Sequence, residues 1–291
     1  MRASRRTLLK TLIAAPAALL ATRPLWAENA TPADDKGPTF AIDLETFWPK
    51  LPFEDRLKHL SDSGFTHYEF TRFKTKDIVK IAKAAKELDL TATQFTVYTG
   101  LTDAKRKDMF LASLDDALEV ATLLEVKRLV VAAGELSKGV DREKQVDAVA
   151  EALTAAAEKV KETEITLLFD PFVKRGDKKG RVVAGVAEAV ELLKDVNSQR
   201  VKLLVDFESG WPVDSPSAEW IREVSGSVGS FRMLDSRLGK SGKTAGLDAL
   251  GLLKLLDELC PKIPIGVELA PKGDPAEVLG RVRQLAKEVK A

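Results

Sequence analysis

Short apolar segments and stretches of helical spacing alternate along almost the whole chain. The eight apolar segments lie at 39–44, 66–71, 91–98, 128–134, 165–170, 201–207, 229–235 and 263–269. The eight stretches with helical spacing lie at 53–64, 75–88, 103–124, 141–162, 183–196, 216–226, 247–259 and 274–289. Such an alternation indicates an α/β fold with a parallel sheet, and eight pairs in about 250 residues match the size of a closed (β/α)₈ (TIM) barrel.

An open, doubly wound sheet is the other architecture that this alternation allows. Eight strands would be unusual for it, and no glycine-rich phosphate fingerprint follows the first apolar segment. We therefore predict a single-domain barrel over residues 38–291.

The N-terminus predicts export. Arg5 and Arg6 precede an apolar run at 11–21, and no acid occurs in the first 27 residues. This segment resembles a twin-arginine signal peptide, and its apolar run is shorter than the roughly 20 residues that span a bilayer. We predict a signal over 1–27, a polar leader over 28–37, and a periplasmic or extracytoplasmic protein with no stable membrane insertion after signal removal.

The charge balance argues against a nucleic-acid partner. The whole chain has a formal charge of +1, which becomes −4 without the five basic residues of the first 27. A nucleic-acid-binding protein would present a basic face. We therefore expect no nucleic-acid partner, and the sequence leaves open whether the chain forms a homo-oligomer.

The barrel model predicts which side chains face its interior. One parity of each strand must contact the helices and be apolar, so the other parity points inward. With the larger apolar residues facing out, Arg232 points inward. Four acids from other strands join it near the C-terminal strand ends, where barrel enzymes carry their active sites: Glu69, Asp170, Asp206 and Glu268.

Arg232 needs acidic neighbours, because burying an unpaired guanidinium is very unfavourable. We expect acids from the segments at 165–170, 201–207 and 263–269 to hold it. Glu69 is either a further salt-bridge partner or a residue that lines the pocket.

Five sequence stretches together resemble the xylose-isomerase-like barrels, which include sugar phosphate isomerases/epimerases, hydroxypyruvate isomerases and ketose 3-epimerases. The stretches are "DRLKHLSDSGFTHYEF", "ITLLFDPFV", "VKLLVDFESGW", "VGSFRMLDSR" and "IGVELAPKGDP". No one stretch is specific, and the resemblance rests on their order and spacing over the whole chain after the leader.

The resemblance implies a small carbohydrate-like ligand. It also implies a divalent ion on four strand-end ligands and two carboxylates that move a proton between neighbouring carbons. Asp206 and Glu268 match two of the ligands, and Asp170 stands where a glutamate is expected. Arg232 stands where the family has histidine or glutamine, and arginine has no lone pair to offer a metal. Ser209 also replaces a histidine that usually follows the strand-six aspartate.

Three interpretations follow. In the first, Asp170, Asp206 and Glu268 hold Mg²⁺ or Mn²⁺, and Asp170 and Glu268 are the acid and base of an isomerase or epimerase. In the second, Arg232 replaces the cation in a non-catalytic carbohydrate-binding pseudoenzyme. In the third, Arg232 stabilises an enediolate without a metal. The further candidates for substrate binding, beside Glu69 and Arg232, are Trp211, Arg237 and Lys272.

Overall fold

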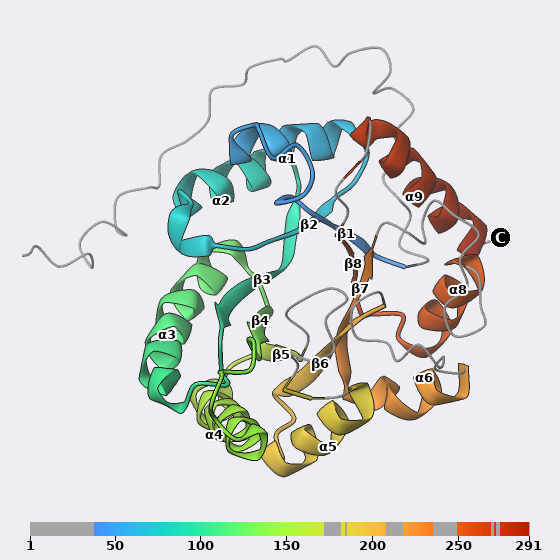
Figure 1. The fold of residues 1–291 in the computed structure, drawn as a ribbon. Coiled ribbons are helices and arrows are strands. Elements are labelled where there is room, and N and C mark those ends of the chain that lie inside the picture. Colours follow the sequence, from blue (N-terminus) through green and yellow to red (C-terminus); the bar gives the residue numbers. More distant parts are fainter. Residues whose placement is uncertain are drawn as a thin grey trace, which may run out of the picture.

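Eight parallel strands close into a barrel that helices surround (Figure 1). The computed structural model describes residues 38–171, 182–183, 185–207, 218–234, 249–268, 271 and 274–290. The strands are β1 Phe40–Asp43, β2 His67–Phe70, β3 Thr91–Thr99, β4 Arg128–Ala132, β5 Thr166–Asp170, β6 Val201–Asp206, β7 Val228–Leu234 and β8 Ile265–Glu268. Each strand pairs with its neighbours in chain order, and β1 closes the ring on β8. The predicted single (β/α)₈ barrel is confirmed.

The helices lie on the outside of this ring. They are α1 Phe53–Asp62, α2 Ile78–Glu87, α3 Lys107–Leu124, α4 Arg142–Val160, α5 Val186–Val196, α6 Ala218–Val224, α8 Ala249–Leu259 and α9 Pro275–Lys290. Short 3₁₀ turns η3 Phe73–Thr75, η4 Ala104–Arg106 and η5 Ser225–Ser227 join them. Asp77 and Asp141 begin α2 and α4 by accepting backbone hydrogen bonds from Lys80 and Glu143, as N-cap residues do. No helix among the described residues is long and apolar enough to cross a membrane.

The apolar side chains form two separate cores. The large one lies between strands and helices and includes outward-facing Tyr68, Leu203 and Val267. A small one, made of Val130, Leu168 and Leu204, lies inside the barrel. The inward and outward parity expected from the sequence is therefore correct for β2, β6 and β8.

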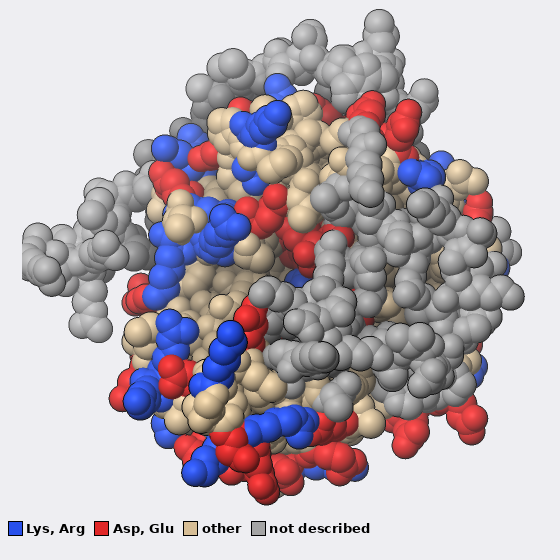
Figure 2. All heavy atoms as spheres, in the orientation of Figure 1, with Lys and Arg blue, Asp and Glu red and all other residues tan. Residues whose placement is uncertain are grey.

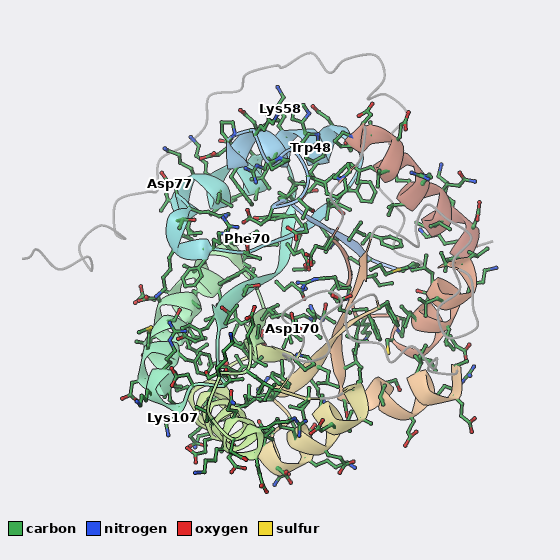
Figure 3. All side chains as sticks on the ribbon, viewed as in Figure 1. Trp48, Lys58, Phe70, Asp77, Lys107 and Asp170 are labelled. Atoms are coloured by element: carbon green, nitrogen blue, oxygen red, sulfur yellow. The ribbon has the colours of Figure 1, made fainter. Side chains whose placement is uncertain are left out.

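The remaining interior is polar toward the C-terminal strand ends. The register places Asp43 beside Glu69 and Glu69 beside Gln94, while Asp206 lies beside Arg232. Figure 3 shows Asp170 near the middle of the ring, whereas Lys58, Asp77 and Lys107 lie toward its circumference. Arg232 and the buried acids therefore meet at this end of the barrel.

Candidate active site

Arg232 is the centre of the charged cluster. Its Nε donates a hydrogen bond to Oε1 of Glu69 at 3.2 Å. Its Nη1 lies 3.2 Å from Oε2 of Glu268 and 3.9 Å from Oδ2 of Asp170. The guanidinium thus bridges three strands of the barrel, β2, β5 and β8, from its own place on β7.

The partners of Arg232 include acids from two of the three expected strands, together with Glu69. Acids from β5 and β8 pair with it as expected, and the deeply buried Glu69 of β2 provides its hydrogen bond. Asp206 of β6 lies next to Arg232 in the strand register, and it lines the same cavity.

Glu69 is a supporting residue beneath the cavity. Its side chain is 3% exposed, against 26% for Glu268 and 11% for Arg232. Gln94 of β3 donates a second hydrogen bond to Glu69, from Nε2 to Oε2 at 2.5 Å. Of the two interpretations open from the sequence, the salt-bridge partner is the one that the geometry supports, and Glu69 acts on the cavity through Arg232.

Asp43 is a buried acid that sequence reasoning missed. It ends β1, is 3% exposed, and accepts a hydrogen bond at Oδ1 from the backbone N–H of Glu45 at 2.7 Å. The signal was present, because Ala41 and Asp43 share the inward parity of β1. The cluster therefore contains five carboxyl groups around one guanidinium: Asp43, Glu69, Asp170, Asp206 and Glu268.

Burial and neighbouring charges shift the pKa values of three of these groups, Asp43, Glu69 and Arg232. Burial, and then the charges of Glu69 and Glu268, raise the pKa of Asp43 well above its ordinary value. Burial also raises the pKa of Glu69, against the opposing effect of Arg232. Burial alone would lower the pKa of Arg232, but the carboxylates of Glu69, Glu268 and Asp170 outweigh it and raise the pKa. Arg232 is therefore always a cation, and Asp43 retains a proton far more readily than an exposed aspartate.

An Asp43→Asn variant should make stability less dependent on pH. The folded state of the wild type retains a proton on Asp43 that the unfolded chain releases above about pH 4. The unfolding free energy of the wild type therefore falls by up to about 1.4 kcal/mol per pH unit, until the pH passes the raised pKa of Asp43 in the folded state. As pH rises from 4, the unfolding free energy of the variant, measured with urea, should increase relative to that of the wild type. A parallel pH dependence of the two proteins would contradict this, and Asp55→Asn on the exposed side of α1 is the control.

Gly266 provides the space that Glu69 occupies. A Cβ atom at this position of β8 would lie 2.8 Å from Oε2 and 2.9 Å from Oε1 of Glu69, closer than real Cβ contacts. A Gly266→Ala variant should lose about 1–3 kcal/mol of unfolding free energy, because Glu69 cannot move without breaking its bonds to Arg232 and Gln94. Gly280→Ala on α9 meets no atom within 4 Å, and it should be neutral or slightly stabilising in the same denaturation experiment. Equal effects of the two substitutions would refute the packing argument.

A cavity of about 780 Å³ lies above this cluster. Four of the predicted site residues line it: Asp170, Asp206, Arg232 and Glu268. The other predicted substrate-binding residues, Trp211, Arg237 and Lys272, lie outside the described residues, as does Ser209. One cavity floor therefore carries four residues that the sequence predicted for the site, the acids of β5, β6 and β8 and the arginine of β7.

The mouth of the cavity carries basic residues that the sequence did not single out. Arg72 and Lys74, in the segment after β2, and Arg106, after β3, line it together with Phe73 and Tyr98. Figure 2 shows basic side chains along one side of the hollow and acidic side chains toward its middle. Sequence spacing gives no signal for this, since loop residues from two different strand ends meet only in the folded barrel.

The donor set does not fit a divalent cation at the strand-seven position. Arg232 lies where a fourth ligand is expected, and its Nη1 is in contact with Glu268 and near Asp170. Among the described residues, no three histidine, cysteine, aspartate or glutamate side chains are grouped so as to hold a metal ion. A permanent guanidinium supplies positive charge at the place where the resemblance implied a cation.

Curated relatives include two isomerases. The chain is 23% identical over 258 residues to the 2-oxo-tetronate isomerase of Pectobacterium atrosepticum, covering 84% of this chain and 96% of the relative. It is 25% identical over 202 residues to a putative hydroxypyruvate isomerase of Caenorhabditis elegans, covering 66% of this chain and 77% of the relative.

Solved structures share the fold. A protein of Brucella melitensis described as AP endonuclease, family 2, superimposes with a TM-score of 0.75 at 23% identity, covering 85% of this chain and 98% of the other. The 3-keto-D-glucoside 4-epimerase of E. coli superimposes with a TM-score of 0.72 at 16% identity, covering 86% and 99%. The model of the family described as "Xylose isomerase-like TIM barrel" matches residues 57–220, which is more than half of the sequence. The chain belongs to the xylose isomerase-like TIM barrel family.

Proposed function

We propose that the protein is a sugar isomerase or epimerase that acts on a small hydroxy-carbonyl compound without a metal ion. The observation that carries the proposal is the position of Arg232 on the cavity floor, with Nη1 between Glu268 and Asp170. The isomerase relatives support the reaction class. The ion pairs of Arg232 with two acids of the cavity floor support a guanidinium in place of a metal ion.

Arg232 would stabilise negative charge on the substrate. Its Nε and Nη1 contact the acids, whereas its Nη2 forms no hydrogen bond with a described residue. A carbonyl oxygen placed against Nη2 would receive a charge-assisted hydrogen bond that strengthens as the oxygen becomes an enediolate. Glu69 and Gln94 fix the guanidinium from below, so this donor is oriented before the substrate arrives.

Glu268 and Asp170 would carry the protons. One carboxylate removes the proton from the hydroxyl-bearing carbon, and the electron pair moves onto the carbonyl oxygen to give an enediolate beside Arg232. The other carboxyl transfers a proton between the two oxygens, and the first carboxyl delivers its proton to the former carbonyl carbon. Delivery of a proton to the original carbon by the other carboxyl, from the opposite face, would instead give an epimer, with the first carboxyl keeping the proton that it removed.

The test is proton exchange with solvent under chelation. Chelator-treated protein is incubated in D₂O with hydroxypyruvate, 2-oxo-tetronate or a ketose, and the C–H signals next to the carbonyl are followed by NMR. We expect deuterium incorporation and an isomeric product with at least one compound. Binding without any exchange across the set would overturn the proposal.

A second candidate is the carbohydrate-binding barrel without catalysis. It is favoured by the ion pairs of Arg232, which engage Asp170 and Glu268 on the cavity floor. The open cavity argues for the enzyme, because all three acids line it. Saturable binding of the same compounds with no exchange would support this candidate.

We also propose export through the twin-arginine pathway, on the basis of Arg5, Arg6 and the apolar run at 11–21. Residues 1–37 lie outside the described part of the chain. Cell fractionation should find the full chain outside the cytoplasm and an Arg5→Lys, Arg6→Lys variant inside it. Equal distribution of both proteins would refute the proposal.

A further inference from the structure

The charges along the cavity are segregated by depth. Asp170 and Asp206 on the floor are buried, at 9% and 7% exposure. The basic side chains of Arg72, Lys74 and Arg106 are exposed at the mouth of the same cavity. The floor holds three carboxyl groups and one guanidinium, so it disfavours a further anionic group, while the mouth attracts one.

Two of the three basic groups at the mouth have no internal partner. Lys74 pairs with Asp116 of α3 at 2.8 Å. The guanidinium groups of Arg72 and Arg106 form no ion pair or hydrogen bond with any described residue. Guanidinium groups match the two oxygens of a carboxylate or phosphate with parallel hydrogen bonds. Arg72 and Arg106 are therefore the groups at the mouth that retain full capacity for an anion.

The segment that carries Arg106 is held in place. Gly100 and Thr102 donate backbone hydrogen bonds to Ala132 and Ala133, at 3.2 and 3.1 Å, which fixes the end of β3 against the end of β4. Gly134 has φ +89°, and a Cβ atom there would lie 2.4 Å from Cα of Gly100. Only glycine fits such an approach, so this part of the mouth is built by close backbone packing.

The segment that carries Arg72 is also held. Arg72 has φ 52° and ψ 45°, which is the left-handed region that arginine rarely adopts. Thr75 donates to the carbonyl oxygen of Arg72 from both its N–H and its hydroxyl, at 3.1 and 2.9 Å. The buried ring of Phe73 packs on Phe95 with centroids 5.4 Å apart, and so anchors the turn. Strained backbone of this kind is concentrated at functional sites.

We infer that the substrate carries an anionic group, a carboxylate or a phosphate, that Arg72 and Arg106 bind at the mouth of the cavity. This inference rests on the proposed function for the other end of the substrate, where the hydroxy-carbonyl group meets Arg232. The two ends of the cavity then orient the molecule, because the acidic floor excludes the anionic end and the basic mouth binds it.

The experiment uses ligands that have no carbonyl and cannot react. Glycerol, D-glycerate and glycerol 3-phosphate are titrated into the protein at low salt by calorimetry or ligand-observed NMR. We expect one or both anions to bind at least about tenfold more tightly than glycerol, with the better one identifying carboxylate or phosphate. Affinity for the anion should fall in 0.5 M salt, at about which concentration exposed charges are strongly screened.

Three matched arginine variants localise the effect. Arg72→Gln and Arg106→Gln should each weaken anion binding about five- to tenfold and leave glycerol binding unchanged. Arg283→Gln, at an exposed position on α9 away from the cavity, should bind like the wild type.

Equal affinity for glycerol and both anions, or unchanged anion binding in both the Arg72→Gln and the Arg106→Gln variant, would overturn the inference. Anion binding that depends on Arg72 and Arg106 in a protein without proton exchange would refute the proposed function alone. Exchange with neutral ketoses only would refute the anionic substrate alone.

Discussion

An Arg232→Met variant should lose about 3–5 kcal/mol of unfolding free energy at pH 8, the usual cost of leaving a buried charge without its partner. Arg232 is the cation that Glu69, Glu268 and Asp170 share, and Glu69 is too deeply buried to be solvated without it. The loss should be smaller at pH 5. Without Arg232 the carboxyl groups retain protons in the folded state that the unfolded chain releases, so stability falls as pH rises.

Urea denaturation at pH 5 and pH 8 measures this loss. Arg142→Met is the matched control, since Arg142 pairs with Glu188 on the surface and such pairs contribute about 1 kcal/mol or less. Adding Glu69→Gln to Arg232→Met should recover part of the loss, because the two residues are in direct contact. A loss below about 1 kcal/mol at both pH values would mean that Arg232 does not neutralise the cluster.

Glu268→Gln and Asp170→Asn should each reduce turnover about 10²- to 10⁴-fold, the contribution of a positioned general acid or base. Both substitutions retain the shape of the side chain and remove its ability to take up a proton. The substrate KM should change much less than kcat, because Arg232 and the cavity walls remain.

Steady-state kinetics and deuterium exchange distinguish the roles of the two residues. The variant that lacks the carbon base should lose exchange at the carbon, whereas the other variant should retain exchange and lose product. Glu164→Gln is the control, because Glu164 is exposed, precedes β5 and pairs with Lys127. Activity within about twofold of the wild type in both site variants would remove the two carboxyls from the mechanism.

The sequence predicted most of the barrel, because strand parity and helix spacing repeat eight times. That rule brought Glu69, Asp170, Glu268 and Arg232 into one interior, where the structure joins them by ion pairs. The same rule applied to β1 also indicates Asp43, which shares the inward parity of Ala41, but the sequence prediction did not include it.

The depth of each charged group could not be predicted in the same way. Parity tells which side a residue faces, and the tilt and register of neighbouring strands decide whether it lies below the cavity, as Glu69 does, or on its floor, as Asp170 does. The basic mouth was missed for a different reason. Arg72 and Arg106 belong to segments after different strands, and the left-handed backbone of Arg72 has no sequence signature.

Elemental analysis shows directly whether Arg232 takes the place of a metal ion. The protein is purified without chelator beside an Arg232→His variant prepared identically, and the divalent metal content per chain is measured in both. We predict an essentially metal-free wild type, and a variant that gains an ion because histidine supplies the lone pair that arginine lacks. About one Mg²⁺, Mn²⁺ or Zn²⁺ per chain in the wild type would contradict the account.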